Sequence, residues 1–230
     1  MNYIKHPLFF LALLALALPF LVTSLGASYT IATEMLVWGI VGLGFNLLLG
    51  YAGLLSFGHG AIFGIAAYTA ALAQPQFAKD MFTPMLTGVT LGTLVGALQG
   101  YLVLRRRGAY FSLLTLVFGQ MFFYVIFRGT AGAAGAAGSG AVTRLPVLGF
   151  VDVRGDLAFY YFVVVFALLL ALAMWRLVRS PFGRVLQGIK QNEARARAIG
   201  YDTQRYLWLA FIISAFYASV GGALIAYALQ

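Results

Sequence analysis

Apolar residues in this sequence are grouped into blocks of about twenty, and this grouping limits the possible folds more than any other feature. As a helix, a block of that length crosses a hydrocarbon core about 30 Å thick. Hydrophobic residues make up 62% of the chain and charged residues only 9%, against about a quarter charged in a soluble domain. We therefore expect an all-α polytopic transmembrane bundle, with residues 1–230 forming a single domain.

The blocks predict seven membrane spans. They cover residues 8–25, 31–49, 54–73, 84–104, 109–127, 157–178 and 206–228. The first block is also compatible with a signal peptide, because Lys5 precedes it and small residues follow it. An uncleaved first span and a cleaved signal both remain open at this point.

Basic residues predict how the bundle is oriented, because short cytoplasmic loops are enriched in Lys and Arg. Most of the 15 basic residues lie near the N-terminus or in the connections that are predicted to be on the same side of the membrane as the N-terminus. They are Lys5, Arg105, Arg106, Arg107, Arg176, Arg179, Arg184, Lys190, Arg195, Arg197 and Arg205. The N-terminus is therefore predicted to be cytoplasmic, and the net charge of +9 indicates topology, not nucleic-acid binding.

Several sequence motifs for catalysis, ATP binding and metal binding are absent. There is no cysteine, which excludes disulfides and thiolate metal sites. Neither a phosphate-binding loop for ATP nor an H-E-x-x-H metal motif occurs. We expect no enzyme activity, cofactor or metal in this chain.

The predicted cytoplasmic connection, residues 179–205, contains a segment with the pattern of one amphipathic helix from Ser180 to Gly200. Ser180 suits the N-cap, Pro181 the first helical position and Gly200 the C-terminal stop. Apolar residues recur at steps of three and four: Phe182, Val185, Leu186, Ile189, Ala196 and Ile199. Such a helix could transmit force from a soluble motor, or it could lie against anionic lipid.

The predicted outer connection, residues 128–156, contains a Gly/Ala-rich stretch at 129–141. Small residues of this kind are typical of a mobile linker. Docking of an external partner is the alternative.

Glycines at 88, 92, 96 and 100 form a stripe along one face of the predicted span 84–104. Small residues at this spacing let a second helix approach closely. We expect tight helix packing there.

Polar residues and glycines are concentrated between Asn46 and Gly64. They predict either a helix broken beside a solute pathway or a cytoplasmic turn followed by a packing face. The candidate pathway residues are Asn46, Ser56, His59, Thr115 and Gln120. An ionisable group such as His59 usually faces the bundle interior or a watery cavity, as a ligand or as a hydrogen-bonded structural group. Thr115 and Gln120 could equally bond to a neighbouring helix.

Three groups of residues resemble the branched-chain amino-acid ABC transporter permeases of the LivM type. They are Ser180-Pro181-Phe182-Gly183-Arg184 with Asn192-Glu193-Ala194-Arg195-Ala196 and Ile199-Gly200-Tyr201, the run from Leu49 to Ala61 with Gly64 to Ala70, and Arg107 to Phe111 with Thr115-Leu116. The resemblance covers the chain from about residue 31 to its end. It implies a bacterial inner-membrane location, a second homologous permease subunit, two cytoplasmic ATPases that use ATP and Mg, and a periplasmic solute-binding protein. Membrane lipid is a further expected partner.

The resemblance also implies an ATPase-coupling role for eight residues: Ser180, Pro181, Phe182, Gly183, Arg184, Glu193, Ala194 and Gly200. Gly200 lies one position later than in the general importer motif. The chain also ends earlier than its relatives and carries an Ala/Gly repeat in the outer connection, so we expect a shortened C-terminus.

Two other functions remain open. An ion-coupled secondary transporter or channel usually needs acidic residues near the bilayer midplane, and Glu34 is the only acid inside the predicted spans. A non-transporting assembly subunit would fit the shortened C-terminus. Branched-chain amino acids are the default solute of the family, and urea, amides and other amino acids are carried by similar permeases.

Overall fold

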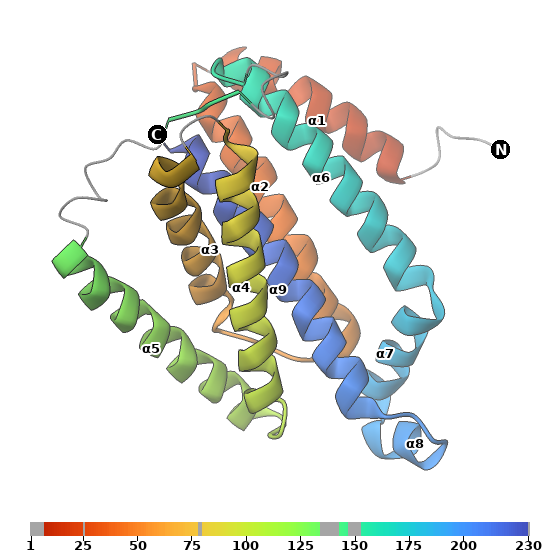
Figure 1. The fold of residues 1–230 in the computed structure, drawn as a ribbon. Coiled ribbons are helices and arrows are strands. Elements are labelled where there is room, and N and C mark those ends of the chain that lie inside the picture. Colours follow the sequence, from red (N-terminus) through yellow and green to blue (C-terminus); the bar gives the residue numbers. More distant parts are fainter. Residues whose placement is uncertain (1–6, 25, 78–79, 134–142, 147–152, 230) are drawn as a thin grey trace.

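The computed structural model describes residues 7–24, 26–77, 80–133, 143–146 and 153–229. In these ranges all regular structure is helical, so the all-α prediction is confirmed there. The elements are α1 (Pro7–Ser24), α2 (Tyr29–Asn46), η2 (Leu47–Ala52), α3 (His59–Ala73), η3 (Gln74–Phe77), α4 (Phe82–Val103), α5 (Ala109–Ala133), α6 (Asp156–Arg179), α7 (Pro181–Gln191), α8 (Glu193–Ala198) and α9 (Thr203–Ala228) (Figure 1).

Four helical stretches in the described ranges are long and apolar enough to cross a membrane. They are Tyr29–Ala52, Phe82–Val103, Asp156–Arg179 and Thr203–Ala228. Shorter apolar helices occupy Phe10–Ser24, His59–Ala73 and Ala109–Val125. Each predicted span therefore overlaps an apolar helix, but in the described ranges only the four stretches above meet both the length and the composition needed to cross a membrane.

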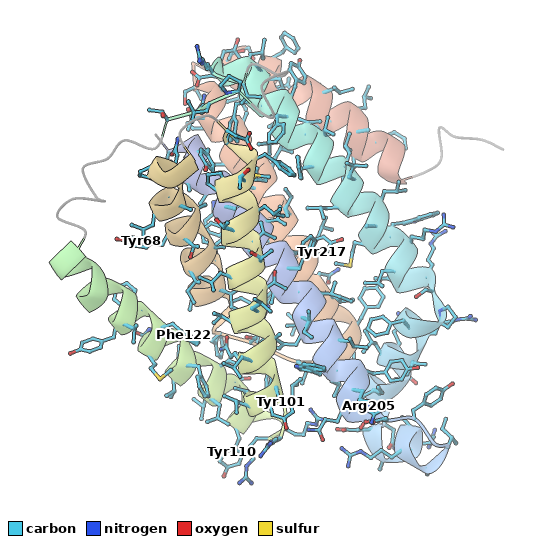
Figure 2. All side chains as sticks on the ribbon, viewed as in Figure 1. Tyr68, Tyr101, Tyr110, Phe122, Arg205 and Tyr217 are labelled. Carbon is cyan, nitrogen blue, oxygen red and sulfur yellow. The ribbon has the colours of Figure 1, made fainter. Side chains whose placement is uncertain are left out.

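Helix α9 is the centre of the bundle, and it packs against α2, α3 and α4 (Figure 1). Most of its residues are buried, including Phe211, Ala215, Ala218 and Leu224. Helix α6 lies farther out, and Tyr217 of α9 reaches across to it (Figure 2). The Tyr217 hydroxyl donates a hydrogen bond of 2.7 Å to the Leu170 carbonyl.

The glycine stripe of α4 makes the close contacts that its spacing predicts. A β-carbon on Gly96 would lie 2.4 Å from Cβ of Ala215 on α9, and one on Gly92 would lie 2.5 Å from Oγ of Ser219. At Gly88 it would lie 2.4 Å from the Ala66 carbonyl oxygen on α3. Glycine therefore allows α4 to sit against two helices at once.

The outer connection is anchored where the structure describes it. Arg144 is buried and its Nε donates a 2.9 Å hydrogen bond to the Tyr227 carbonyl at the end of α9. Its guanidinium also pairs with Asp156 and lies 4.5 Å from the centre of the Phe159 ring. The predicted mobile linker, 129–141, is only partly covered: α5 continues to Ala133, beyond the expected end at 127, and residues 134–141 lie outside the described ranges.

Helices α7 and α8 and the turn between α4 and α5 lie at one end of the bundle, and the C-terminus lies at the other (Figure 1). The basic residues of both segments are therefore gathered at one end, as the charge pattern predicts.

Candidate functional site

The chain between α2 and α3 is irregular, and its side chains alternate between buried, at Leu54 and Ser56, and exposed, at Leu55 and Phe57. After the widened turn η2, Gly53 adopts φ +72°, which favours glycine, and residues 53–58 form no helix. Side chains from α5 hold this segment: Ser112 Oγ donates a 2.6 Å hydrogen bond to the Leu55 carbonyl, and the Phe57 amide donates one of 3.0 Å to Thr115 Oγ1. Both predictions for the run from Asn46 to Gly64 include an interruption between helices, and the structure has it at residues 53–58.

His59 opens α3 and is hydrogen-bonded at both ring nitrogens. Nδ1 lies 2.9 Å from Ser56 Oγ, and Nε2 lies 2.8 Å from Ser214 Oγ near the middle of α9. The rings of Phe45 and Phe211 meet the imidazole edge-on. In this arrangement the imidazole joins the irregular segment to α9, which is the structural role that the sequence left open beside the ligand role.

The candidate pathway residues do not all meet. Ser56, His59 and Thr115 are buried around the irregular segment, whereas Asn46 and Gln120 are exposed. The Asn46 side chain lies against Gly50 of η2, one turn along its own helix.

Two buried polar residues of this region were missed by the sequence reasoning. One is Ser214, the partner of His59. The other is Gln99 of α4, which is 1% exposed and whose Nε2 would lie 2.6 Å from a β-carbon on Gly58. Both Ser214 and Gln99 are polar residues inside predicted spans, and this could have identified them from the sequence.

The Ser-Pro-Phe-Gly-Arg segment makes the turn from α6 into α7. Ser180 is extended at the N-cap, its Oγ donates a 2.6 Å hydrogen bond to the Leu177 carbonyl, and Pro181 occupies the first turn. The Phe182 ring stacks on Tyr206 at 5.7 Å. Gly183 needs to be glycine, because a β-carbon would lie 2.2 Å from the carbonyl oxygen of Val178.

The predicted single helix from Ser180 to Gly200 is wrong, because it is divided at Asn192. That residue has φ −157° and ψ 98°, and its side chain accepts a hydrogen bond from the Arg195 amide, which caps α8. An N-cap of this kind stabilises a new helix start. The change of direction leaves Ile199 70% exposed, although the periodicity placed it on the apolar face. Gly200 does end the segment, with φ +96°.

Glu193 is the centre of an ion-pair network among the helix ends. Arg107, in the turn before α5, donates to both carboxylate oxygens at 3.1 and 2.9 Å. Arg197 and the Thr203 hydroxyl donate to Oε1 at 2.7 and 2.9 Å. Partial burial acts to raise the pKa of Glu193, but the hydrogen bonds from Arg107 and Thr203 and the charges of Arg107 and Arg197 outweigh it, so that the pKa lies below its usual value.

Comparison with known families decides the classification of this bundle. The family described as branched-chain amino acid transport system / permease component matches residues 27–230. The chain belongs to this permease family. It is 31% identical to the high-affinity branched-chain amino acid transport system permease protein LivM of Salmonella typhimurium and 30% identical to LivM of Escherichia coli.

Each of these alignments covers 97% of the chain and 58% of the relative. The chain thus spans little more than half the length of the two LivM proteins. No solved structure matches it.

In this permease-family chain, α7 and α8 border a groove of about 430 Å³ at the end of the bundle. Its lining is both basic and apolar: Pro181, Arg184, Val185, Gly188, Gln191, Asn192, Arg195, Ala196, Ile199 and Tyr201. Arg184 and Arg195 are exposed. Of the eight predicted coupling residues, Pro181 and Arg184 line the groove, whereas Gly183 shapes the preceding turn and the carboxylate of Glu193 faces the ion-pair network. Ala194 is exposed on α8.

Proposed function

We propose that this chain is a transmembrane permease subunit of an ATP-binding-cassette importer for branched-chain or related amino acids. Membership of the permease family is the observation that carries the proposal. The two LivM relatives are named for branched-chain amino acid transport, which supports this substrate class. The basic residues gathered at the α7–α8 end support a cytoplasmic location for that end. In the proposed seven-span bundle of the bacterial inner membrane, the N-terminus then lies on the same, cytoplasmic side.

The remaining parts of the importer are partners in this proposal. Two cytoplasmic ATPases bind ATP and Mg, a second homologous permease subunit completes the pathway, and a periplasmic protein delivers the solute. Closure of the ATPases on ATP drives alternating access, so that the solute moves inward. This chain carries no phosphate loop of its own.

The groove bordered by α7 and α8 is the proposed ATPase contact. Exposed Ile199 and Tyr201 offer apolar anchors, and Arg184 and Arg195 favour a partner surface that carries carboxylates. Helices α7 and α8, which border the groove, lie at the end of the bundle opposite the C-terminus (Figure 1).

The test is to express tagged chain with the proteins of its genomic neighbourhood, purify it in mild detergent and assay reconstituted vesicles for ATP-driven leucine uptake. We expect two phosphate-loop ATPases and a second permease to copurify. Double substitution Arg184→Glu/Arg195→Glu should lower ATPase recovery at least about tenfold, as expected for reversed interface charges. The matched control is Arg105→Glu/Arg106→Glu, at the same end of the bundle but outside the groove.

Purification of folded chain without ATPases from cells that contain them would contradict the proposal. Uptake that needs an ion gradient and no ATP would establish the secondary-transporter alternative instead.

A further inference from the structure

Lys190 connects α7 to η2, the turn that precedes the irregular segment 53–58. Its Nζ donates a hydrogen bond of 2.8 Å to the Gly50 carbonyl in η2. Its stem lies over Gly53, where a β-carbon would come within 2.9 Å of the lysine Cγ. The N-terminal side of segment 53–58 is therefore held by the cytoplasmic helix α7.

Arg107 forms a second connection, on the other side of the same segment. It pairs with Glu193 of α8 through two hydrogen bonds and lies two residues before α5. The first turns of α5 then hold the segment through Ser112 on the Leu55 carbonyl and Thr115 on the Phe57 amide. Arg107 and α5 thus connect α8 to residues 55–57.

Helix α5 packs against α3 and α4, and in its N-terminal half buried Phe111 meets the Phe211 ring of α9. The outward side chains of α5 include exposed Leu113, Val117, Phe123 and Tyr124, and Figure 1 shows its C-terminal half standing away from α4. The Arg107 pair and the contacts with segment 53–58 therefore both involve the packed, N-terminal half of α5.

We propose that Lys190 and Arg107 are positioning residues that hold the irregular segment 53–58 between the coupling helices α7 and α8. This inference rests on the proposed function, in which α7 and α8 receive the movement of the ATPases. A displacement of these helices then moves Ser56 and the start of α3 at His59, whose ring is joined to α9. Without the two bonds, α7 and α8 move while the segment stays behind or fluctuates.

The first experiment is hydrogen–deuterium exchange on the full chain in nanodiscs. Lys190→Met and Arg107→Gln should each speed amide exchange in residues 54–58 at least about fivefold, because each removes a charge-assisted hydrogen bond. Exchange in α3 beyond Ile65 should stay within about twofold of wild type, since local opening leaves the rest of the fold protected. Arg106→Gln, one residue away, is the matched control for Arg107, and Lys190→Arg should restore protection because it keeps a cationic donor.

Unchanged exchange in 54–58 in both variants would overturn the inference. Equal acceleration throughout the bundle would also overturn it, because the bonds would then contribute only to global stability.

The second experiment counts ATP hydrolysed per leucine transported by the assembled importer. Lys190→Met and Arg107→Gln should raise this ratio at least about fivefold with ATPase copurification retained, and Lys190→Arg and Arg106→Gln should leave it near wild type. An unchanged ratio in both variants would overturn the positioning role. Absence of ATP-driven uptake in the wild type would contradict the proposed function instead, and the exchange data from nanodiscs would still decide whether Lys190 and Arg107 hold segment 53–58.

Discussion

At the scale of single residues, two glycines of α7 differ in what surrounds them. Gly183 lies against the carbonyl of Val178, whereas Gly188 has open space where a side chain would begin. Both are in the same helix, so their helix propensities are comparable and their surroundings are not. Comparing them separates the need for a tight turn from the general cost of glycine.

We predict that Gly183→Ala destabilises the protein by about 1–3 kcal/mol, the usual cost of overpacking. Gly188→Ala should be neutral or stabilising by up to about 1 kcal/mol, because alanine is the better helix former. Thermal unfolding of both variants in the same detergent measures the difference. Equal stability of the two variants would show that the α6–α7 turn tolerates a side chain.

The lowered pKa of Glu193 predicts that the stability of the protein depends on pH. Its pKa is lowered in the folded state, so its charge stabilises the fold above the ordinary carboxyl pKa of about 4.3. That contribution is lost as the pH falls through the lowered value. Glu193→Gln should therefore unfold at a lower temperature than wild type at pH 7. The difference between the two unfolding temperatures should become smaller as the pH falls below about 4.

Unfolding of both proteins in nanodiscs at several pH values tests this dependence. If the difference in unfolding temperature between wild type and Glu193→Gln stayed constant with pH, Glu193 would contribute through its shape and not through its charge. Asp202→Asn provides the control, since Asp202 pairs with Arg205 in a much more exposed position.

At the scale of elements, the packing of α4 against α9 depends on the absence of side chains. Gly96 meets Ala215 directly, and Gly92 meets Ser219. A membrane provides no hydrophobic drive between helices, so close van der Waals contact of this kind carries much of the association.

We predict that Gly96→Leu separates the two helices and lowers the free energy of unfolding by at least about 1–3 kcal/mol. Gly39→Leu on α2 is the matched control, because nothing lies within 4 Å of its β-position, and we expect little change there. Tryptophan fluorescence during unfolding in detergent is the measurement, since Trp208 of α9 donates a hydrogen bond to the Ala97 carbonyl of α4. Similar losses in the two variants would contradict the packing role of the stripe.

The break between α7 and α8 depends on the N-cap of α8 at Asn192. Helix periodicity continues through residues 189–196, but capping by Asn192 starts a second helix in a new direction. The turn brings Glu193 to Arg107 and leaves Ile199 beside the groove. A local capping bond therefore decides which residues face the bundle and which line the groove.

At the scale of the whole molecule, Arg144 fastens the outer connection to the central helix. It donates to the last carbonyls of α9, pairs with Asp156 at the start of α6 and lies on Phe159. One side chain thus joins segments that are more than eighty residues apart in sequence.

We predict that Arg144→Met lowers the free energy of unfolding by about 1–3 kcal/mol, because it leaves buried carbonyl groups unpaired. Asp156→Asn should cost less, because Asp156 is 57% exposed and the bonds to the carbonyls remain. Thermal unfolding in nanodiscs compares the two, and limited proteolysis checks whether the outer connection becomes more accessible. A larger loss in Asp156→Asn than in Arg144→Met would contradict this assignment.

The helical class, the approximate extent of each apolar helix, the close-packing stripe of α4 and the two ends of segment 180–200 could all be predicted from the sequence. These features depend on residue type and local spacing, which a single sequence records: block length, glycine periodicity and capping residues. The break near His59 belongs to the same group, because glycines and polar residues interrupt the apolar pattern there.

The long-range contacts could not be predicted in this way. Glu193 pairs with Arg107, 86 positions away, and His59 is hydrogen-bonded to Ser214, 155 positions away. Such pairs arise from the packing of α8 and α9 against other helices, and no periodicity within one helix encodes them. The same packing left Asn46 and Gln120 exposed and buried Gln99, because a polar residue in a span faces inward or outward according to its neighbours.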